Sequence, residues 1–120
     1  LSYVHAEGYP AGEMKHGPLA LIEEGMPVVV LAPRDKKYKK TISNMQEVIA
    51  RGGKVLMITN DKSKTLSENI RFKFELPDFQ SPMSAFLLTI PIQFLAYHVA
   101  LLKNCDIDKP RNLAKSVTVE

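Results

Sequence analysis

The order of apolar and polar residues divides the chain into short segments of recognisable type. Residues 27–33, Pro-Val-Val-Val-Leu-Ala-Pro, form a continuous apolar run bounded by prolines, and residues 54–60, Lys-Val-Leu-Met-Ile-Thr-Asn, form a second run. Short β-branched runs of this kind are typical of parallel strands that are buried on both faces. Both segments are therefore predicted to be buried strands.

The segment between these runs has the spacing of a helix. Within residues 36–51 an apolar side chain recurs every three or four positions, at Tyr38, Ile42, Met45 and Ile49. Such spacing gives one apolar stripe, and Gly52 and Gly53 follow at a position where helices often end. A strand, a helix and a second strand in this order predict a parallel pair with a right-handed crossover.

Residues 71–76, Arg-Phe-Lys-Phe-Glu-Leu, alternate instead. Phe72, Phe74 and Leu76 fall on one face and the charged residues on the other, which is typical of a half-exposed strand towards a sheet edge.

Residues 84–103 are the most apolar part of the chain, and their length alone would suit a membrane span. Thr89, Pro91, Gln93 and His98 argue against that interpretation. A helix buried by other helices or at a subunit interface is expected, with no membrane contact, and Pro91 should kink or begin it.

The composition of the chain fits one small domain. It has 120 residues, of which 45% are hydrophobic and 24% charged. Because its first residue is Leu1 and not Met, we expect a piece of a longer protein. The one cysteine, Cys105, excludes an internal disulfide and suits a reducing, cytoplasmic compartment.

Neither nucleic acid nor a metal is expected as a partner. The net charge is only +3, and the dense basic run at residues 34–40 contains a single aromatic side chain. His5 and Glu7 form a His-x-Glu pair, but the Pro-Cys-x-x-Cys element of zinc deaminases is missing. Neither His16 nor His98 completes a ligand spacing, and His98 reads as a core or interface histidine. No cofactor is predicted.

Two long motifs carry more information than the composition does. The first is His-Ala-Glu-Gly-Tyr-Pro-Ala-Gly-Glu-Met-Lys-His-Gly-Pro-Leu-Ala-Leu-Ile at residues 5–22, whose glycines and prolines predict a tight, irregular path. The second is Pro-Arg-Asn-Leu-Ala-Lys-Ser-Val-Thr-Val-Glu at residues 110–120, preceded by Leu-Ala-Tyr-His-Val-Ala at 95–100 and Asp-Ile-Asp at 106–108. Its apolar side chains predict a docked tail.

Together these motifs resemble the C-terminal part of the isomerase domain of the glucosamine-6-phosphate synthases, within the sugar isomerase (SIS) family. The resemblance implies an α/β fold, with three α/β/α layers around a parallel sheet, in one of two tandem subdomains. Residues 1–120 would be the second SIS subdomain, with residues 104–120 as an active-site tail. Ligands of open parallel sheets bind beyond the carboxyl ends of the strands, so residues 32–33 and 60–61 should face that side.

The resemblance also implies an activity. The glucosamine-6-phosphate synthases convert fructose 6-phosphate, with ammonia from glutamine, into glucosamine 6-phosphate. By resemblance, Lys115 is the amine that forms a Schiff base with the ketose carbonyl, and Ala114 gives the sugar a backbone contact. His16 would assist ring opening from the neighbouring subunit of a homodimer. Histidine suits this task because it exchanges protons near neutral pH.

Other parts of the family's active site would lie outside this chain. The resemblance places a catalytic glutamate and a lysine in a Lys-Leu-Lys-Glu stretch before Leu1, a phosphate-binding loop in the first SIS subdomain, and ammonia release in a glutaminase domain. The chain alone is therefore expected to be inactive.

Two other classes of function stay open at this point. One is a catalytically silent sugar-phosphate-binding SIS domain of a regulator, which would not need Lys115. The other is a structural interface module, supported mainly by the apolar residues 84–103. A tail lysine on its own is more often a solvated surface residue.

Overall fold

The computed structural model describes residues 1–63, 70–79 and 82–111. The chain divides into two compact units. The larger unit is Gly8–Leu88, and the smaller one combines Leu1–Glu7 with Thr89–Glu120.

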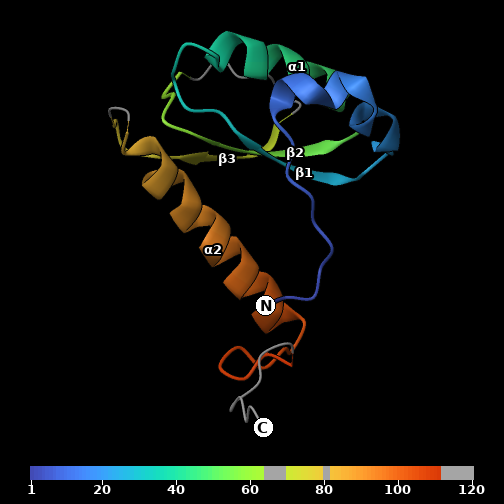
Figure 1. The fold of residues 1–120 in the computed structure, drawn as a ribbon, viewed down its shortest axis with the longest axis vertical. Coiled ribbons are helices and arrows are strands. Elements are labelled where there is room, and N and C mark those ends of the chain that lie inside the picture. The colour runs from blue at the N-terminus through green and yellow to red at the C-terminus, as the bar shows by residue number, and fades with distance from the viewer. Residues whose placement is uncertain (64–69, 80–81, 112–120) are drawn as a thin grey trace, which may run out of the picture. The chain divides into compact units, whose positions relative to one another are not determined.

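A parallel sheet with the strand order β1-β2-β3 forms the centre of the larger unit (Figure 1). The strands are β1 Pro27–Leu31, β2 Lys54–Thr59 and β3 Ile70–Glu75. The predicted parallel pairing of the first two strands is confirmed, and β3 lies at the edge as expected.

Helix α1, Tyr38–Ala50, connects β1 to β2 and ends at the predicted glycines. Gly52 has φ 85°, and its N–H donates to the Ile49 carbonyl at 2.9 Å. The Gly53 N–H donates to the Val48 carbonyl at 3.1 Å. This pair of bonds is a Schellman motif, in which a left-handed glycine satisfies the last helical carbonyls.

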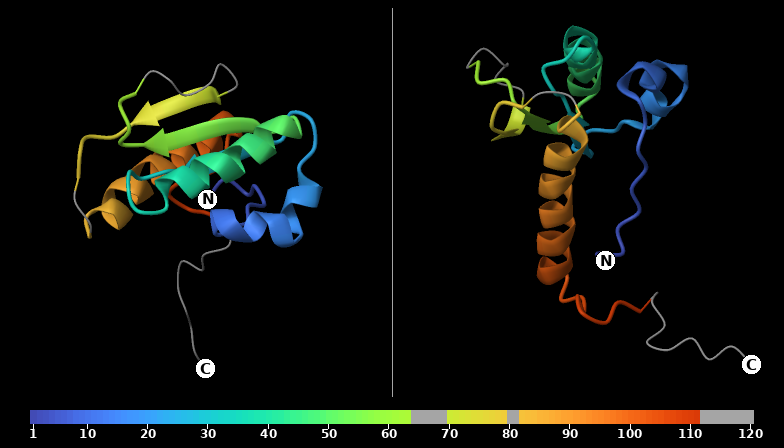
Figure 2. Two further views of the ribbon diagram at one scale, coloured as in Figure 1. Left: turned by 90° about the horizontal axis from the view of Figure 1, so that it is seen from above. Right: turned by 60° about the vertical axis from the view of Figure 1, so that its left-hand side comes forward.

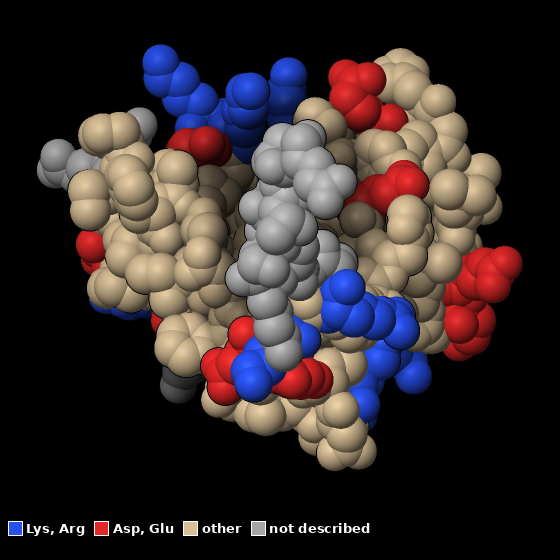
Figure 3. All heavy atoms as spheres, turned by 60° about the horizontal axis from the view of Figure 1, so that its bottom comes forward, with Lys and Arg blue, Asp and Glu red and all other residues tan. Residues whose placement is uncertain are grey.

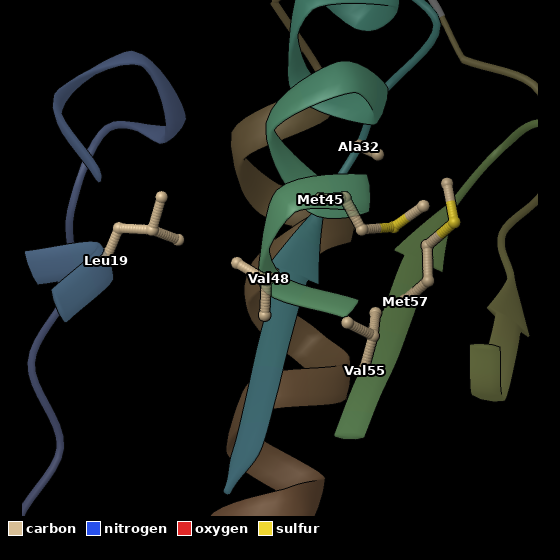
Figure 4. Packing of buried hydrophobic residues seen from close by; sticks show 6 residues of the cluster. All are labelled: Leu19, Ala32, Met45, Val48, Val55 and Met57. Atoms are coloured by element: carbon tan, nitrogen blue, oxygen red, sulfur yellow. The ribbon is translucent and has the colours of Figure 1, made fainter. Parts of the chain in front are cut away.

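The main core lies between the sheet and the layer formed by α1 and two short 3-10 helices, η1 Ala11–His16 and η2 Pro18–Leu21. Its buried residues are Leu19, Ala32, Met45, Val48, Val55 and Met57 (Figure 4). In the close view, Met45 of α1 points towards Met57 of β2. Burying a side chain of this size contributes about 1.5–3 kcal/mol, so this contact fixes α1 on the sheet.

The opposite face of the sheet carries a smaller cluster. Ile58 of β2 packs there with Leu76 and Leu88, and Leu56 and Leu87 lie half-buried beside them. Leu87 and Leu88 come from the beginning of helix α2, Ser84–Leu102. The larger unit therefore has the predicted α/β/α layering, with helical residues on both faces of a parallel sheet.

The second face is only partly covered, which corrects one prediction. Val29 and Leu31 of β1 are 41% and 38% exposed, and Phe72 and Phe74 of β3 are 55% and 44% exposed. β1 was predicted to be buried on both faces and is not, because the residues that pack on this face cluster around β2. These side chains form an uncovered apolar surface. Such a surface is unusual, because parallel sheets are normally covered on both faces.

Helix α2 contains Pro91 in its interior and continues past it. By length and composition alone α2 could cross a membrane, a weak indication because core helices of other proteins pass the same test. Only 6% of an 18-residue window of α2 is buried in this structure, so α2 is not covered by other helices here, and the alternative of a subunit interface stays a prediction. Its large apolar side chains are exposed instead: Phe86, Ile90, Ile92, Phe94, Tyr97, Leu101 and Leu102.

The end of α2 also has a defined geometry. Asn104 has a positive φ of 53°, its N–H donates to the Leu101 carbonyl at 2.9 Å, and the Cys105 N–H donates to the Ala100 carbonyl at 2.9 Å. Asparagine tolerates this left-handed position better than most residues. The helix thus ends in a second Schellman motif, which includes the first two residues of the predicted tail.

Candidate functional site

His16 is the last residue of η1. Gly17, with φ 144°, separates η1 from η2, so the predicted tight and irregular path is confirmed. The His16 side chain is exposed, and it forms no hydrogen bond, ion pair or ring contact with any other described residue. Its imidazole is therefore available to a group from outside the larger unit.

The residues before His16 hold η1 against the larger unit. The half-buried Met14 packs on the main core, and the Lys15 ammonium lies 2.6 Å from the Glu47 carboxylate of α1. No side-chain hydrogen bond caps the beginning of η1 at Pro10. These contacts, and not the short helix itself, set the position of His16.

The carboxyl ends of β1 and β2 meet where the parallel topology places them. The Thr59 hydroxyl donates to the Ala32 carbonyl at 2.6 Å, and the Arg34 N–H donates to Asn60 Oδ1 at 2.8 Å. Thr59, Asn60 and Asp61 are all buried. The two connections that follow the strands are thus joined by hydrogen bonds, as buried polar groups require.

Asp61 is the centre of a small polar network at this edge of the sheet. Its Oδ2 accepts hydrogen bonds from the Tyr38 hydroxyl at 2.5 Å and the Ser63 hydroxyl at 2.7 Å. The bond from Tyr38, followed by that from Ser63, lowers the pKa of Asp61 to about 2. Burial and the bond to Asp61 raise the pKa of Tyr38 to about 12. Asp61 is therefore an ionised acceptor that fixes the start of α1, and a poor proton acceptor in catalysis.

The approach to the tail lies in the smaller unit. The Arg111 N–H donates to the Tyr3 hydroxyl at 2.7 Å, and its guanidinium lies 3.9 Å above the centre of the Tyr3 ring. The Lys103 ammonium donates to the Ser2 carbonyl at 2.7 Å. The chain entering the tail is thus attached to the N-terminal segment by a cation–π contact and hydrogen bonds.

The predicted tail residues lie beyond this attachment. Lys115 and Ala114, and the predicted docking of the tail, fall outside the described residues. The structure therefore describes His16 in the larger unit and the entrance to the tail in the smaller one, and the predicted pairing of His16 with Lys115 stays a prediction.

The two other histidines, His5 and His98, each contact side chains that are close to them in sequence. Within residues 1–63, 70–79 and 82–111, no group of three or more His, Cys, Asp or Glu side chains is arranged to hold a metal ion. His5 lies 3.1 Å from Glu7 in an exposed pair. His98 stacks on Phe94 and forms a T-shaped contact with Tyr97. Because it is exposed, it is not a core histidine in this structure, and its predicted role at an interface stays a prediction.

Charge is distributed in small groups on the visible surface. Figure 3 shows one face on which basic and acidic side chains alternate with broad uncharged areas. On this face the residues other than Lys, Arg, Asp and Glu cover the larger part of the described surface.

Two contacts were missed by the sequence analysis. Tyr38 was counted only as part of the apolar stripe, although its hydroxyl reaches Asp61. The pairing of Lys15 with Glu47 had no signal in the sequence, since lysine and glutamate are frequent on surfaces and only the fold brings these two together. The position of Asn60 and Asp61 at the carboxyl edge was the signal for the first contact.

Comparison with known proteins agrees with the parallel sheet and its flanking helices. A family model described as SIS domain matches residues 1–103. The glutamine–fructose-6-phosphate aminotransferase [isomerizing] of Brucella abortus is 55% identical over 121 residues, which cover 100% of this chain and 20% of that protein. The protein of the same name from Aquifex aeolicus is 52% identical and is covered to the same 20%.

A solved structure is similar as well. The C-terminal domain of glucosamine-fructose-6-phosphate aminotransferase from Francisella tularensis superposes with a TM-score of 0.82 at 44% identity, covering 88% of this chain and 30% of that one. The chain thus spans about a fifth of the length of the curated relatives that it matches.

A Tyr38→Phe substitution tests the network at the carboxyl edge. It removes the largest cause of the low pKa of Asp61, which should rise from about 2 towards its ordinary value of 3.8. A lowered folded-state pKa gives stability that is present above the unfolded value and lost as pH falls from about 4 to 2. The variant should lose about 1–3 kcal/mol of unfolding free energy at pH 7 and show less acid sensitivity in that window.

Carboxyl ¹³C NMR titration and denaturant unfolding between pH 2 and 7 measure both effects. Tyr97→Phe is the matched control, because it also removes a tyrosine hydroxyl but lies on α2, outside the network of Asp61. The Tyr97 ring forms a T-shaped contact with His98. An unchanged pKa of Asp61 in Tyr38→Phe would contradict the assignment.

Proposed function

Because the chain belongs to the SIS domain family, we propose that it completes the isomerase domain of a larger hexosamine-forming enzyme. That enzyme would convert fructose 6-phosphate and glutamine-derived ammonia into glucosamine 6-phosphate. The observation that carries the proposal is the similarity along the whole chain, at 52–55% identity, to proteins named for this reaction. Fold alone would be a weaker argument, since one fold supports many functions.

The domain assignment goes with this proposal. Residues 1–120 form the second SIS subdomain, and residues 104–120 form the tail of the active site. The parent chain adds the first SIS subdomain and a glutaminase domain, in a homodimer located in the cytoplasm. The uncovered apolar side chains of β1 and β3 support the need for further protein on the second face of the sheet.

Lys115 is the proposed nucleophile. Its ε-amine adds to the C2 carbonyl of the open-chain ketose, and loss of water leaves an iminium ion. Ammonia then adds to the iminium carbon at C2 and displaces the lysine amine, which leaves the ketose as its own iminium and frees Lys115. The positive charge on that nitrogen withdraws electrons and eases removal of a proton from C1. Ala114 holds the sugar through its backbone. The tail motif and the fixed approach through Arg111 support this assignment.

His16 is the proposed proton carrier for ring opening, which must precede that step. Opening breaks the bond between C2 and the ring oxygen, so the oxygen gains a proton while the C2 hydroxyl loses one. One imidazole near neutral pH can deliver and collect these protons. The exposure of His16 and its lack of a described partner support a role in the site of the neighbouring subunit.

A silent sugar-phosphate-binding domain of a regulator is the second candidate, and a Lys115→Arg variant of the full-length parent separates the two. Arginine keeps the positive charge but stays protonated, so it forms no iminium. We expect turnover of fructose 6-phosphate to be abolished while calorimetry shows its affinity nearly unchanged. Full turnover in the variant would contradict the role of Lys115. A parent that binds fructose 6-phosphate without turning it over would instead favour the regulator.

The cross-subunit role of His16 predicts complementation between inactive variants. His16→Ala should lower turnover by about 10²–10⁴-fold, the usual contribution of a proton-transferring group. In a heterodimer of His16→Ala with Lys115→Ala, one site receives both intact residues and the other receives neither. Random mixing should therefore restore about a quarter of the wild-type activity in a two-fold symmetric dimer.

Steady-state assays of the mixed variants, with heterodimers verified by native mass spectrometry, measure this recovery. Each variant mixed with itself is the control. No recovery despite verified heterodimers would show that His16 serves its own subunit.

A further inference from the structure

We propose that Glu47 is a positioning residue for His16, because its carboxylate holds Lys15 and thereby the short helix that presents the imidazole. This inference rests on the proposed function of His16 in ring opening. It adds Glu47 of α1 to the residues of the proposed site, with a role that acts through Lys15 and not on the substrate itself.

The helix that carries His16 has little stability of its own. η1 contains 6 residues, none of them buried, and has no side-chain cap at its first residue. 3-10 helices have poorer hydrogen-bond geometry than α-helices, and short helices are marginal without tertiary contacts. The direction of His16 must therefore be set by the residues that attach η1 to the rest of the larger unit.

Lys15 is the polar attachment, and it directly precedes His16. Its ammonium lies 2.6 Å from the Glu47 carboxylate. Successive side chains of a 3-10 helix differ in direction by about 120°, because the helix has about three residues per turn. When Lys15 reaches to α1, His16 must therefore point elsewhere, and the structure leaves it exposed.

The base of this attachment is rigid. Met45 and Val48, on either side of Glu47 in α1, are 2% and 3% exposed and belong to the main core. Helix α1 is in turn fixed at its start by the bond from Tyr38 to Asp61. A site held by a packed helix is placed more accurately than one held by a loop.

Placement is the expected role of this ion pair, since its contribution to stability should be small. The side chains of Lys15 and Glu47 are 50% and 38% exposed. Ion pairs of this exposure stabilise proteins little, because water screens the charges and ordering two long side chains costs entropy. A Glu47→Gln variant should therefore fold normally and lose only the accuracy with which His16 is presented.

The test compares two substrates of the full-length parent. Fructose 6-phosphate is a closed furanose that must open, whereas 5-deoxyfructose 6-phosphate lacks the hydroxyl that closes the ring and needs no opening. Glu47→Gln should lower kcat for fructose 6-phosphate about fivefold, close to 1 kcal/mol at tenfold per 1.36 kcal/mol. Its kcat for the deoxy analogue and its thermal midpoint should stay at the wild-type values.

The matched control is Glu75→Gln, which removes the ion pair between Lys73 and Glu75, 2.8 Å long and placed on β3. It should change neither rate. The exchanged pair Lys15→Glu with Glu47→Lys should recover most of the loss, because it restores the attraction in reverse.

Equal rates for Glu47→Gln and wild type with fructose 6-phosphate would overturn the inference, as would an equal loss with both substrates. A parallel His16→Ala variant separates the two proposals. A selective loss in His16→Ala without one in Glu47→Gln overturns only the role of Glu47. An equal loss with both substrates in His16→Ala overturns ring opening by His16, and the inference with it.

Discussion

The burial of β2 from both sides is the constraint on which the rest of the structure depends. Val55 and Met57 face the main core, and Ile58 faces the smaller cluster on the other side. Figure 2 shows β2 beside β3 with α1 lying along the sheet. Because Met45 fixes α1 on β2, the Glu47 carboxylate of α1, which holds η1 through Lys15, is also fixed in position. The core thereby sets the position of η1, which carries the exposed His16.

The regular elements follow from local chemistry and were predictable. The apolar run of β2, the stripe along α1 and the terminating Gly52 and Gly53 each depend on neighbours in sequence, and the structure confirms them. The uncovered face of β1 and the exposed surface of α2 were not, because a buried composition does not reveal which chain segment supplies the cover. Both features were missed for one reason: an apolar pattern shows that a segment needs to be covered, but it does not show which other segment covers it.

The candidate site was predictable only in part. His16 and the tail were proposed as site residues from long motifs, and that role stays a prediction, whereas the surroundings of His16 depend on Lys15 meeting Glu47 across the fold. The polar network of Asp61 shows the same limit, since its location followed from parallel topology but its hydrogen-bond donors did not. The resulting division is that a rigid larger unit presents the histidine, while the smaller unit fixes the chain that enters the tail at Arg111.

We expect this chain to supply the amine that binds the ketose. Borohydride reduction of the full-length parent with bound fructose 6-phosphate would trap the iminium as a stable secondary amine, and peptide mass spectrometry would locate it. We expect a reduced sugar-phosphate adduct on Lys115. An unmodified Lys115, in a parent with demonstrated sugar-phosphate binding, would show that this lysine does not form the Schiff base.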